Sequence, residues 1–259
     1  MKRLVYGINP VREALRGRGG RGAKGGSGGE VEKVVVSEGR CGRAAEEILK
    51  DAASKGIKVE RVARKALDTL AGTQKHQGVL ATLRGEYPYR DIEDLLSAWK
   101  ESGTRAFFLV LDSIQDPQNL GSLVRTAHAA GVHGVITPKD RSAEVTAAVV
   151  KASAGATEHT RVARVTNLAD ALKRLKEEGV WVVGVEADSE EDIFTADLDR
   201  DLALVIGSEG KGIRRLVRER CDFCVSIPMA GRINSLNAAQ AGAVALFEAK
   251  RQRGRGGNG

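Results

Sequence analysis

The sequence predicts an α/β protein with two domains: a small N-terminal α/β domain and a larger C-terminal domain built on a parallel sheet. Along most of the chain, short apolar runs of strand length alternate with segments of helical periodicity. The apolar residues are mainly aliphatic, since hydrophobic residues make up 42% of the chain and aromatic residues only 4%. With 259 residues, the chain is long enough for one large or two small domains.

The first domain is expected to span residues 1–85. Asn9 and Pro10 are placed to cap and begin a short helix that ends near Leu15. Further on, periodicity predicts three strands and two helices: Val34–Val36, Lys58–Val62 and Val79–Leu83 as strands, and Arg43–Ala53 and Arg64–Leu70 as helices. A linker at residues 86–91, which contains Pro88, is expected to end this domain.

A glycine-rich loop at residues 17–29 interrupts the first domain, with eight glycines in 13 positions and three basic residues. No core can form from such a stretch, so we expect a flexible basic loop that either touches RNA phosphates or is a tolerated insertion. Residues 1–85 carry a net charge of +9, whereas the rest of the chain carries −2. This asymmetry is expected if the first domain approaches a polyanion; a merely soluble basic surface is the alternative. His76 lies in a polar loop and is either a structural histidine or a functional one.

The second domain is expected to span residues 92–250, with alternating strands and helices that indicate a parallel sheet covered on both faces. Helices are predicted at Ile92–Lys100, near Leu120–Ala130, through Ala143–Ala152 and at Leu168–Glu178, and strands at Phe107–Leu111, Gly134–Thr137 and Val180–Val185. The remaining residues, 251–259, are predicted to form a disordered basic tail.

Composition argues against several classes of protein. No apolar run approaches the roughly 20 residues that span a bilayer, and no signal peptide is evident, so we expect no membrane association. Cys41, Cys221 and Cys224 form no disulfide framework, which indicates the reducing cytoplasm. Cys221 and Cys224 have C-x-x-C spacing, but no second pair of ligands follows, so we expect no bound metal.

Two glycine- and polar-rich turns each lie between a hydrophobic strand and a helix. The first ends the run Leu204–Gly212, and the second lies within Ser226–Asn237. Glycines directly after a strand let a ligand approach backbone N–H groups, so the two turns are expected to form the walls of one pocket. The first turn has neither Walker A nor G-x-G-x-x-G spacing. Glu209 within it is either an acid of the ligand site or a residue that begins a helix.

A third polar segment follows the strand Phe107–Leu111. Asn119 is expected to open the next helix, and Arg125 falls in its second turn among apolar neighbours. Loops at the carboxyl ends of parallel strands commonly bind ligands, and the arginine fork suits a phosphate or an RNA backbone. A solvated surface arginine is the alternative. A similar polar cap, Asn234–Asn237, precedes an alanine-rich helix.

These three segments together resemble the SpoU-type RNA ribose 2′-O-methyltransferases of the SPOUT superfamily. The shared pattern is an N-x-x-x-x-x-R block, a GxEGxG block and an IPM…SLN block, in that order. The first domain, with Tyr6-Gly7 and His76-Gln77-Gly78, resembles the ribosomal-protein-like substrate-binding domain of the branch that methylates a guanosine in 23S ribosomal RNA. Ala239 departs from the family pattern, which often has serine there, so no role is assigned to it.

The resemblance implies a C-terminal trefoil knot, S-adenosylmethionine as methyl donor, and a homodimer with the pocket close to the partner subunit. It implies that backbone groups of Gly207, Ile227 and Leu236 hold the donor, with Met229 nearby, and that the catalytic residues are Asn119, Arg125, Glu209, Ser235 and Asn237. In the family, the arginine is assigned the activation of the ribose hydroxyl. Because guanidinium is effectively always protonated, we favour phosphate binding and stabilisation of the developing alkoxide.

Two rival functions stay open at this stage. The same chemistry could act on transfer RNA or on an antibiotic-resistance site of ribosomal RNA, although the minimal transfer-RNA type usually lacks the extra N-terminal domain. A non-catalytic RNA-binding protein of ribosome assembly would also explain the basic first domain. Binding of the methyl donor to the isolated protein separates the enzymes from that last alternative.

Overall fold

The computed structural model describes residues 2–17, 29–39, 42–231 and 235–255. The chain forms two compact units that interleave along the sequence. The N-terminal unit consists of Met1–Pro88 together with Glu144–His159, and the C-terminal unit consists of Tyr89–Ala143 and Thr160–Gly259. The sequence placed residues 144–159 in the second domain, whereas in the structure their contacts group them with the first.

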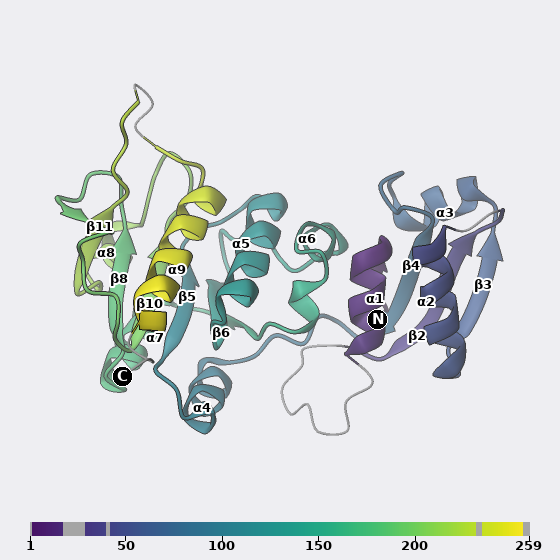
Figure 1. Cartoon of the computed structure of the whole chain (residues 1–259), viewed down its shortest axis with the longest axis horizontal. Coiled ribbons are helices and arrows are strands. Elements are labelled where there is room, and N and C mark those ends of the chain that lie inside the picture. The colour runs from purple at the N-terminus through teal and green to yellow at the C-terminus, as the bar shows by residue number, and fades with distance from the viewer. Residues whose placement is uncertain (1, 18–28, 40–41, 232–234, 256–259) are drawn as a thin grey trace. The chain divides into compact units, whose positions relative to one another are not determined.

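The N-terminal unit contains a four-stranded sheet with the order β1-β4-β2-β3 (Figure 1). Only β2 and β3 run parallel; β4 pairs antiparallel with β1 and β2. The strands are β1 (Lys2–Tyr6), β2 (Val31–Ser37), β3 (Lys58–Val62) and β4 (Val79–Arg84), and the helices that follow the first three are α1 (Ile8–Arg16), α2 (Arg43–Ser54) and α3 (Arg64–Ala71). The predicted strands and helices of this part are confirmed to within three residues, and β1 was missed.

The first helix does not begin as predicted. Gly7, with φ of 98°, occupies the N-cap position before Ile8, and the Ile8 nitrogen donates to Gln77 Oε1 at 3.1 Å. Glycine adopts this backbone conformation readily, and a Cβ at this position would overlap the Lys151 ammonium. The Gly7 nitrogen also donates to the Val79 carbonyl at 3.0 Å, which ties the start of α1 to β4. The assignment of Asn9 as the cap was therefore wrong.

His76 has a structural role. Its side chain is fully buried, its Nδ1 accepts a hydrogen bond from the Gly78 nitrogen at 2.9 Å, and its Nε2 lies 2.7 Å from Asp68 Oδ1. Since Nδ1 accepts, the ring is assigned the tautomer in which Nε2–H donates to the carboxylate. Both ring nitrogens are thus used inside the fold.

Residues 144–159 hold the N-terminal unit together through a buried ion pair. This segment contains α6 (Ala147–Ala152), shorter than the helix predicted from residue 143, and the 3-10 turn η1 (Ala156–Glu158). Arg3 of β1 forms a bidentate pair with Glu158, with both N–O distances at 2.9 Å. Side-chain exposure is 7% for the arginine and 0% for the glutamate. The Tyr87 hydroxyl donates to the Thr157 carbonyl at 2.9 Å beside this pair.

The C-terminal unit contains a seven-stranded sheet with the order β7-β6-β5-β10-β8-β11-β9, and every pairing between these strands is parallel. The predicted parallel sheet is thus confirmed. Its strands are β5 (Phe107–Leu111), β6 (Gly134–Pro138), β7 (Val162–Val165), β8 (Trp181–Val185), β9 (Glu191–Asp192), β10 (Leu202–Ile206) and β11 (Phe223–Ser226).

Helices cover both faces of this sheet. Apolar residues of α4 (Ile92–Ser102), α7 (Leu168–Glu177) and α8 (Arg215–Arg218) share one buried cluster with Phe108 and Val110 of β5. On the other face, α5 (Pro117–Ala130) packs against α9 (Ala238–Arg255), and Figure 1 shows these two helices side by side. Gly242 makes this approach possible, because a Cβ there would overlap the Leu123 side chain.

The predicted disordered tail is corrected over its first five residues, since α9 continues to Arg255. Arg253 donates to the carbonyl oxygens of Arg200 and Arg105, both at 2.6 Å, and Gln252 accepts from the Leu198 nitrogen at 2.8 Å. Polar side chains that bond to neighbouring backbone groups stabilise a helix end that composition alone marks as disordered. Residues 256–259 lie outside the described residues.

Two further expectations fall partly on residues that the structure does not describe. Most of the glycine-rich loop, residues 18–28, lies outside the described residues, and so do residues 232–234 of the segment that would complete the knot. The trefoil knot therefore stays a prediction. In the described part of the chain, no helix is both long enough and apolar enough to cross a membrane.

Candidate functional site

A closed glycine turn follows β10 at the centre of the C-terminal sheet. Ser208 and Gly212 exchange backbone hydrogen bonds, with N–O distances of 3.1 and 2.9 Å. Gly210 and Gly212 have φ angles of 75° and 62°, a backbone conformation that residues other than glycine rarely adopt. The buried Gly207 lies so close to Gly212 and Ile213 that a Cβ would overlap their backbone atoms. The glycines are therefore required by the geometry of the turn.

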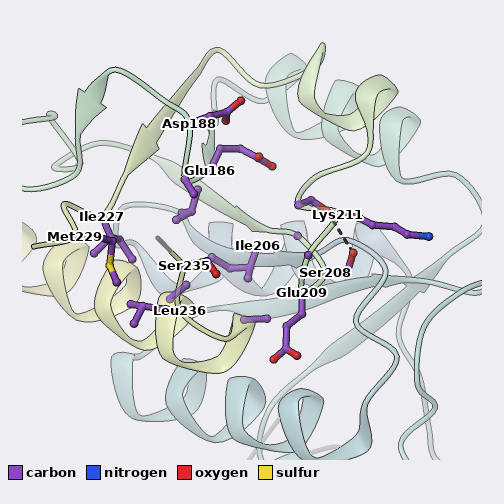
Figure 2. Close-up of a pocket in the computed structure, with 17 residues that line it drawn as sticks. Glu186, Asp188, Ile206, Ser208, Glu209, Lys211, Ile227, Met229, Ser235 and Leu236 are labelled. Carbon is purple, nitrogen blue, oxygen red and sulfur yellow. Dashed lines mark hydrogen bonds between the residues drawn. The ribbon is translucent and has the colours of Figure 1, made fainter. Parts of the chain in front are cut away.

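A cavity of about 480 Å³, here called the first cavity, lies beside this turn. Figure 2 shows labelled side chains around it: Glu186 and Asp188 at the top, Ile227 and Met229 on the left, and the glycine turn on the right. Both glycine-rich turns contribute to its lining, which confirms the expectation that they form walls of one pocket. Of the predicted site residues, it is lined by Gly207, Glu209, Ile227, Met229, Ser235 and Leu236.

Glu186 and Asp188, which the sequence did not single out, also line the first cavity. Glu186 follows β8, and its carboxylate accepts a hydrogen bond from the Ile213 nitrogen, so it fastens the end of β8 to the glycine turn. Burial raises the pKa of this carboxyl. The available signal was the position of both acids at the carboxyl end of a parallel strand next to β10.

Asp116, rather than Asn119, begins the helix after β5. Its carboxylate accepts from the nitrogens of Gln118 at 3.1 Å and Asn119 at 3.4 Å, and Pro117 is the first residue of α5. The predicted role of Asn119 as the opening residue was wrong, because the Asp-Pro pair already caps the helix. The Asn119 side chain is thereby free to donate from Nδ2 to Glu209 Oε1 at 2.9 Å. Two predicted site residues from distant segments meet in this bond.

A second cavity of about 390 Å³ adjoins the first and shares Ser208, Glu209, Lys211 and Ala238 with it. Its remaining lining comes from the loop after β5, from the start of α5 and from two arginines: Ser113, Ile114, Gln115, Asp116, Asn119, Arg141 and Arg214. Two cavities that meet at one turn are suited to a transfer between two bound molecules.

The remaining predicted site residues do not line either cavity in the structure. Asn237 accepts from the Gln240 nitrogen through Oδ1 at 2.7 Å and caps α9, and it lines neither cavity. Asn234 lies outside the described residues. Arg125 is exposed on α5 and lines neither cavity, and its side chain makes no hydrogen bond or ion pair with the residues that the structure describes. Asn119, Glu209 and Ser235 therefore come together at the cavities, and Arg125 does not join them within one chain.

Comparison with known proteins is consistent with this geometry. Residues 106–247 match the SpoU rRNA Methylase family, and residues 4–89 match the domain described as RNA 2′-O ribose methyltransferase substrate binding. A Bacillus subtilis (strain 168) protein, YacO, named for the TrmH family of tRNA/rRNA methyltransferases, is 47% identical over 221 residues, which cover 85% of this chain and 88% of that protein.

Solved structures give the same result. The SpoU methyltransferase AviRb from Streptomyces viridochromogenes, in complex with the cofactor AdoMet, superposes with a TM-score of 0.78 at 26% identity, covering 98% of this chain and 91% of its own. A TrmH/SpoU tRNA-modifying enzyme of A. aeolicus superposes with a TM-score of 0.55 at 25% identity, covering 64% of this chain and 86% of its own.

The residues of the first cavity fit S-adenosylmethionine. The donor carries a flat adenine, and its methionine part carries a sulfonium, an ammonium and a carboxylate, with a net charge of one positive unit. Ile206, Ile227 and Leu236 offer apolar surface for a flat ring, and the carboxylates of Glu186 and Asp188 suit positive charge. The volume also lies in the ordinary range for small-molecule sites, about 300–1,000 Å³. The chain therefore belongs to the SpoU rRNA methylase family of S-adenosylmethionine-dependent RNA 2′-O-methyltransferases.

Proposed function

We propose that the protein methylates the ribose 2′-hydroxyl of a guanosine in 23S ribosomal RNA and acts as a homodimer. The observation that carries the chemistry is the pair of adjoining cavities that meet at Glu209. The N-terminal unit supports a ribosomal substrate, because the A. aeolicus tRNA-modifying enzyme covers only 64% of this chain, whereas an rRNA methyltransferase from Sinorhizobium meliloti covers 96%. A minimal tRNA enzyme has no need of the additional unit.

The bound donor supplies an electrophilic methyl group. The ribose oxygen forms the new C–O bond as the S–CH₃ bond breaks, and the hydroxyl proton must be accepted. Glu209 is the group we assign to this proton: its Oε1 accepts from Asn119, and its Oε2 has no hydrogen-bond donor among the described residues. Asn119 thus orients the carboxylate, and Ser235 lines the donor side. Glu209 lines both cavities and can therefore contact both the donor and the ribose.

Arg125 is proposed to bind an RNA phosphate and to stabilise the developing alkoxide. Its exposed place on α5 leaves all of its donors free for RNA or for a site on a second copy of the chain. In a homodimer whose pocket lies close to the partner subunit, Arg125 of one subunit would complete the catalytic region of the other.

Arg125→Lys is expected to lower turnover about tenfold while donor affinity stays unchanged, because lysine keeps the charge and loses the bidentate fork. Single-turnover methylation, together with donor titration by calorimetry, measures both quantities. Arg220→Lys, at an exposed arginine that lines neither cavity, is the matched control. Full turnover in Arg125→Lys would show that bidentate geometry has no role.

The substrate is tested with labelled S-adenosylmethionine and two transcripts without native modifications, one of 23S ribosomal RNA and one of transfer RNA. We expect label in the ribosomal transcript, at a single guanosine. Label only in transfer RNA would overturn the substrate assignment and keep the chemistry. Absence of donor binding would favour the non-catalytic assembly protein.

A further inference from the structure

The second cavity has the features of a binding site for one nucleotide of the RNA strand. Three cationic side chains line it, those of Arg141, Lys211 and Arg214. Its two acids accept hydrogen bonds from neutral donors: Asp116 accepts from the backbone of α5, and Glu209 accepts from Asn119 through Oε1. Arg141 and Lys211 make no hydrogen bond or ion pair with any described residue. Neither acid forms an ion pair with Arg141 or Lys211, so these two cations are available to an anionic ligand beside the donor pocket.

Arg214 is held in place by a buried carboxylate. Asp112, which is fully buried at the end of β5, accepts from both the backbone nitrogen and the Nε of Arg214, each at 2.7 Å. The arginine side chain is 39% exposed, and its two terminal nitrogens have no acceptor in the described part of the chain. The buried pair fixes the stem of the side chain and leaves the fork available, as required for a pre-positioned phosphate contact.

Arg141 and Ser113, which both line this cavity, have unusual backbone conformations. Their φ angles are 58° and 62°, in the left-handed region that residues other than glycine rarely adopt. Such backbone strain persists where the surroundings impose it, commonly at ligand sites.

Hydrogen bonds next to Arg141 and Ser113 hold these two backbone segments in place. The Ser142 hydroxyl lies 2.6 Å from the Thr137 hydroxyl and donates to the Ile114 carbonyl at 3.3 Å, and the Ala143 nitrogen donates to the same carbonyl at 2.8 Å. These bonds fasten the loop that carries Arg141 to the loop that carries Ser113. The two strained residues are thus held together in the lining of one cavity.

We propose that the second cavity receives the target nucleotide of the RNA and that Arg141 and Arg214 bind the phosphodiester groups on either side of its ribose. Asp112 is then a positioning residue that acts through Arg214. This proposal rests on the function proposed above and names the protein groups that recognise the acceptor. The first cavity, with the carboxylates of Glu186 and Asp188, takes the cationic donor, and the second cavity, with Arg141 and Arg214, takes the anionic strand.

The test compares Arg141→Gln and Arg214→Gln with the unchanged full chain, using the unmodified 23S transcript in the presence of S-adenosylhomocysteine. We expect RNA affinity to fall about tenfold in each variant, with donor affinity within twofold of the unchanged protein. We also expect the slope of log affinity against log salt to decrease by roughly 0.7–0.9 for each phosphate contact removed. A residue that only supports the fold would not change this slope.

Arg215→Gln is the matched control, because Arg215 is the next residue in sequence, is 79% exposed and does not line the second cavity. The proposal would be overturned if Arg141→Gln and Arg214→Gln had the same RNA affinity and the same salt slope as Arg215→Gln. The RNA-binding result stands apart from the proposed reaction: an unchanged protein that binds RNA but methylates no transcript would contradict the function and leave the binding comparison valid.

Asp112→Asn tests the positioning role. Asparagine keeps one acceptor and loses the charge, so we expect weaker RNA binding with the same reduced salt slope as in Arg214→Gln. In the double variant, the loss should not exceed that of Arg214→Gln alone. Additive losses would show that Asp112 does not act through Arg214. A thermal unfolding curve identifies any variant that fails to fold. If Asp112→Asn or Arg214→Gln does not fold, Arg141→Gln still tests whether the second cavity binds RNA.

Discussion

Gly207→Ala is expected to lower donor affinity at least about a hundredfold. A Cβ at residue 207 would overlap the Gly212 carbonyl and the Ile213 nitrogen, and both are backbone atoms that cannot rotate away. The hydrogen bonds between Ser208 and Gly212 would have to open, which would deform the wall of the first cavity. Calorimetric titration with S-adenosylmethionine measures the loss, and circular dichroism shows whether the fold persists.

Gly210→Ala is the control for this experiment. Gly210 belongs to the same turn and lines the same cavity, but a Cβ there would meet no atom within 4 Å. Its φ of 75° makes alanine strained by about 1 kcal/mol, so a modest, few-fold effect is expected. Equal donor affinity in Gly207→Ala and the unchanged protein would contradict the proposed role of the turn.

Arg3→Met is expected to lower the free energy of unfolding of the N-terminal unit by about 3–5 kcal/mol, because it leaves the fully buried Glu158 without its partner. It also removes the contact of the guanidinium with the Tyr87 ring, whose centroid lies 5.3 Å away. Urea unfolding, followed by a probe placed in this unit, measures the change.

Two comparisons separate the buried charge from other effects of this substitution. In the double variant Arg3→Met/Glu158→Met, no buried charge remains, so most of the stability should return. Arg16→Met removes a surface pair with Glu13, in which the arginine is 62% exposed, and should cost less than about 1 kcal/mol. Equal losses for the Arg3 and Arg16 variants would show that burial of the first pair contributes little.

Sequence periodicity located most of the elements because apolar spacing reflects burial. The strands at Lys58–Val62 and Phe107–Leu111 agree with the structure to the residue. Four helix starts, at Arg43, Arg64, Ile92 and Leu168, also agree to the residue. The starts of α1 and α5 were wrong, because Gly7 precedes α1 and Asp116 caps α5, where asparagines had been expected. The role of residues 144–159 depends on the long-range pair between Arg3 and Glu158, which no local pattern reveals.

The candidate site was partly predictable for a related reason. A glycine that must lie against backbone leaves a pattern in the sequence, so the turn at Gly207 could be found. The second wall at Ile227 could be found from a polar segment that follows a hydrophobic strand. Glu186 and Arg214 carry no such pattern, since an acid after a strand or an arginine after a glycine turn is also common on surfaces. Their importance follows from the order of the strands in the sheet and from the buried Asp112.

The most direct test of the central claim identifies the atom that receives the methyl group. The unchanged protein is incubated with labelled S-adenosylmethionine and unmodified 23S transcript, the RNA is digested to nucleosides, and the labelled product is identified by chromatography and mass spectrometry. We predict a 2′-O-methylated guanosine as the only labelled nucleoside. Label on a base, or no label in RNA although the donor binds, would contradict transfer to a ribose hydroxyl in this transcript.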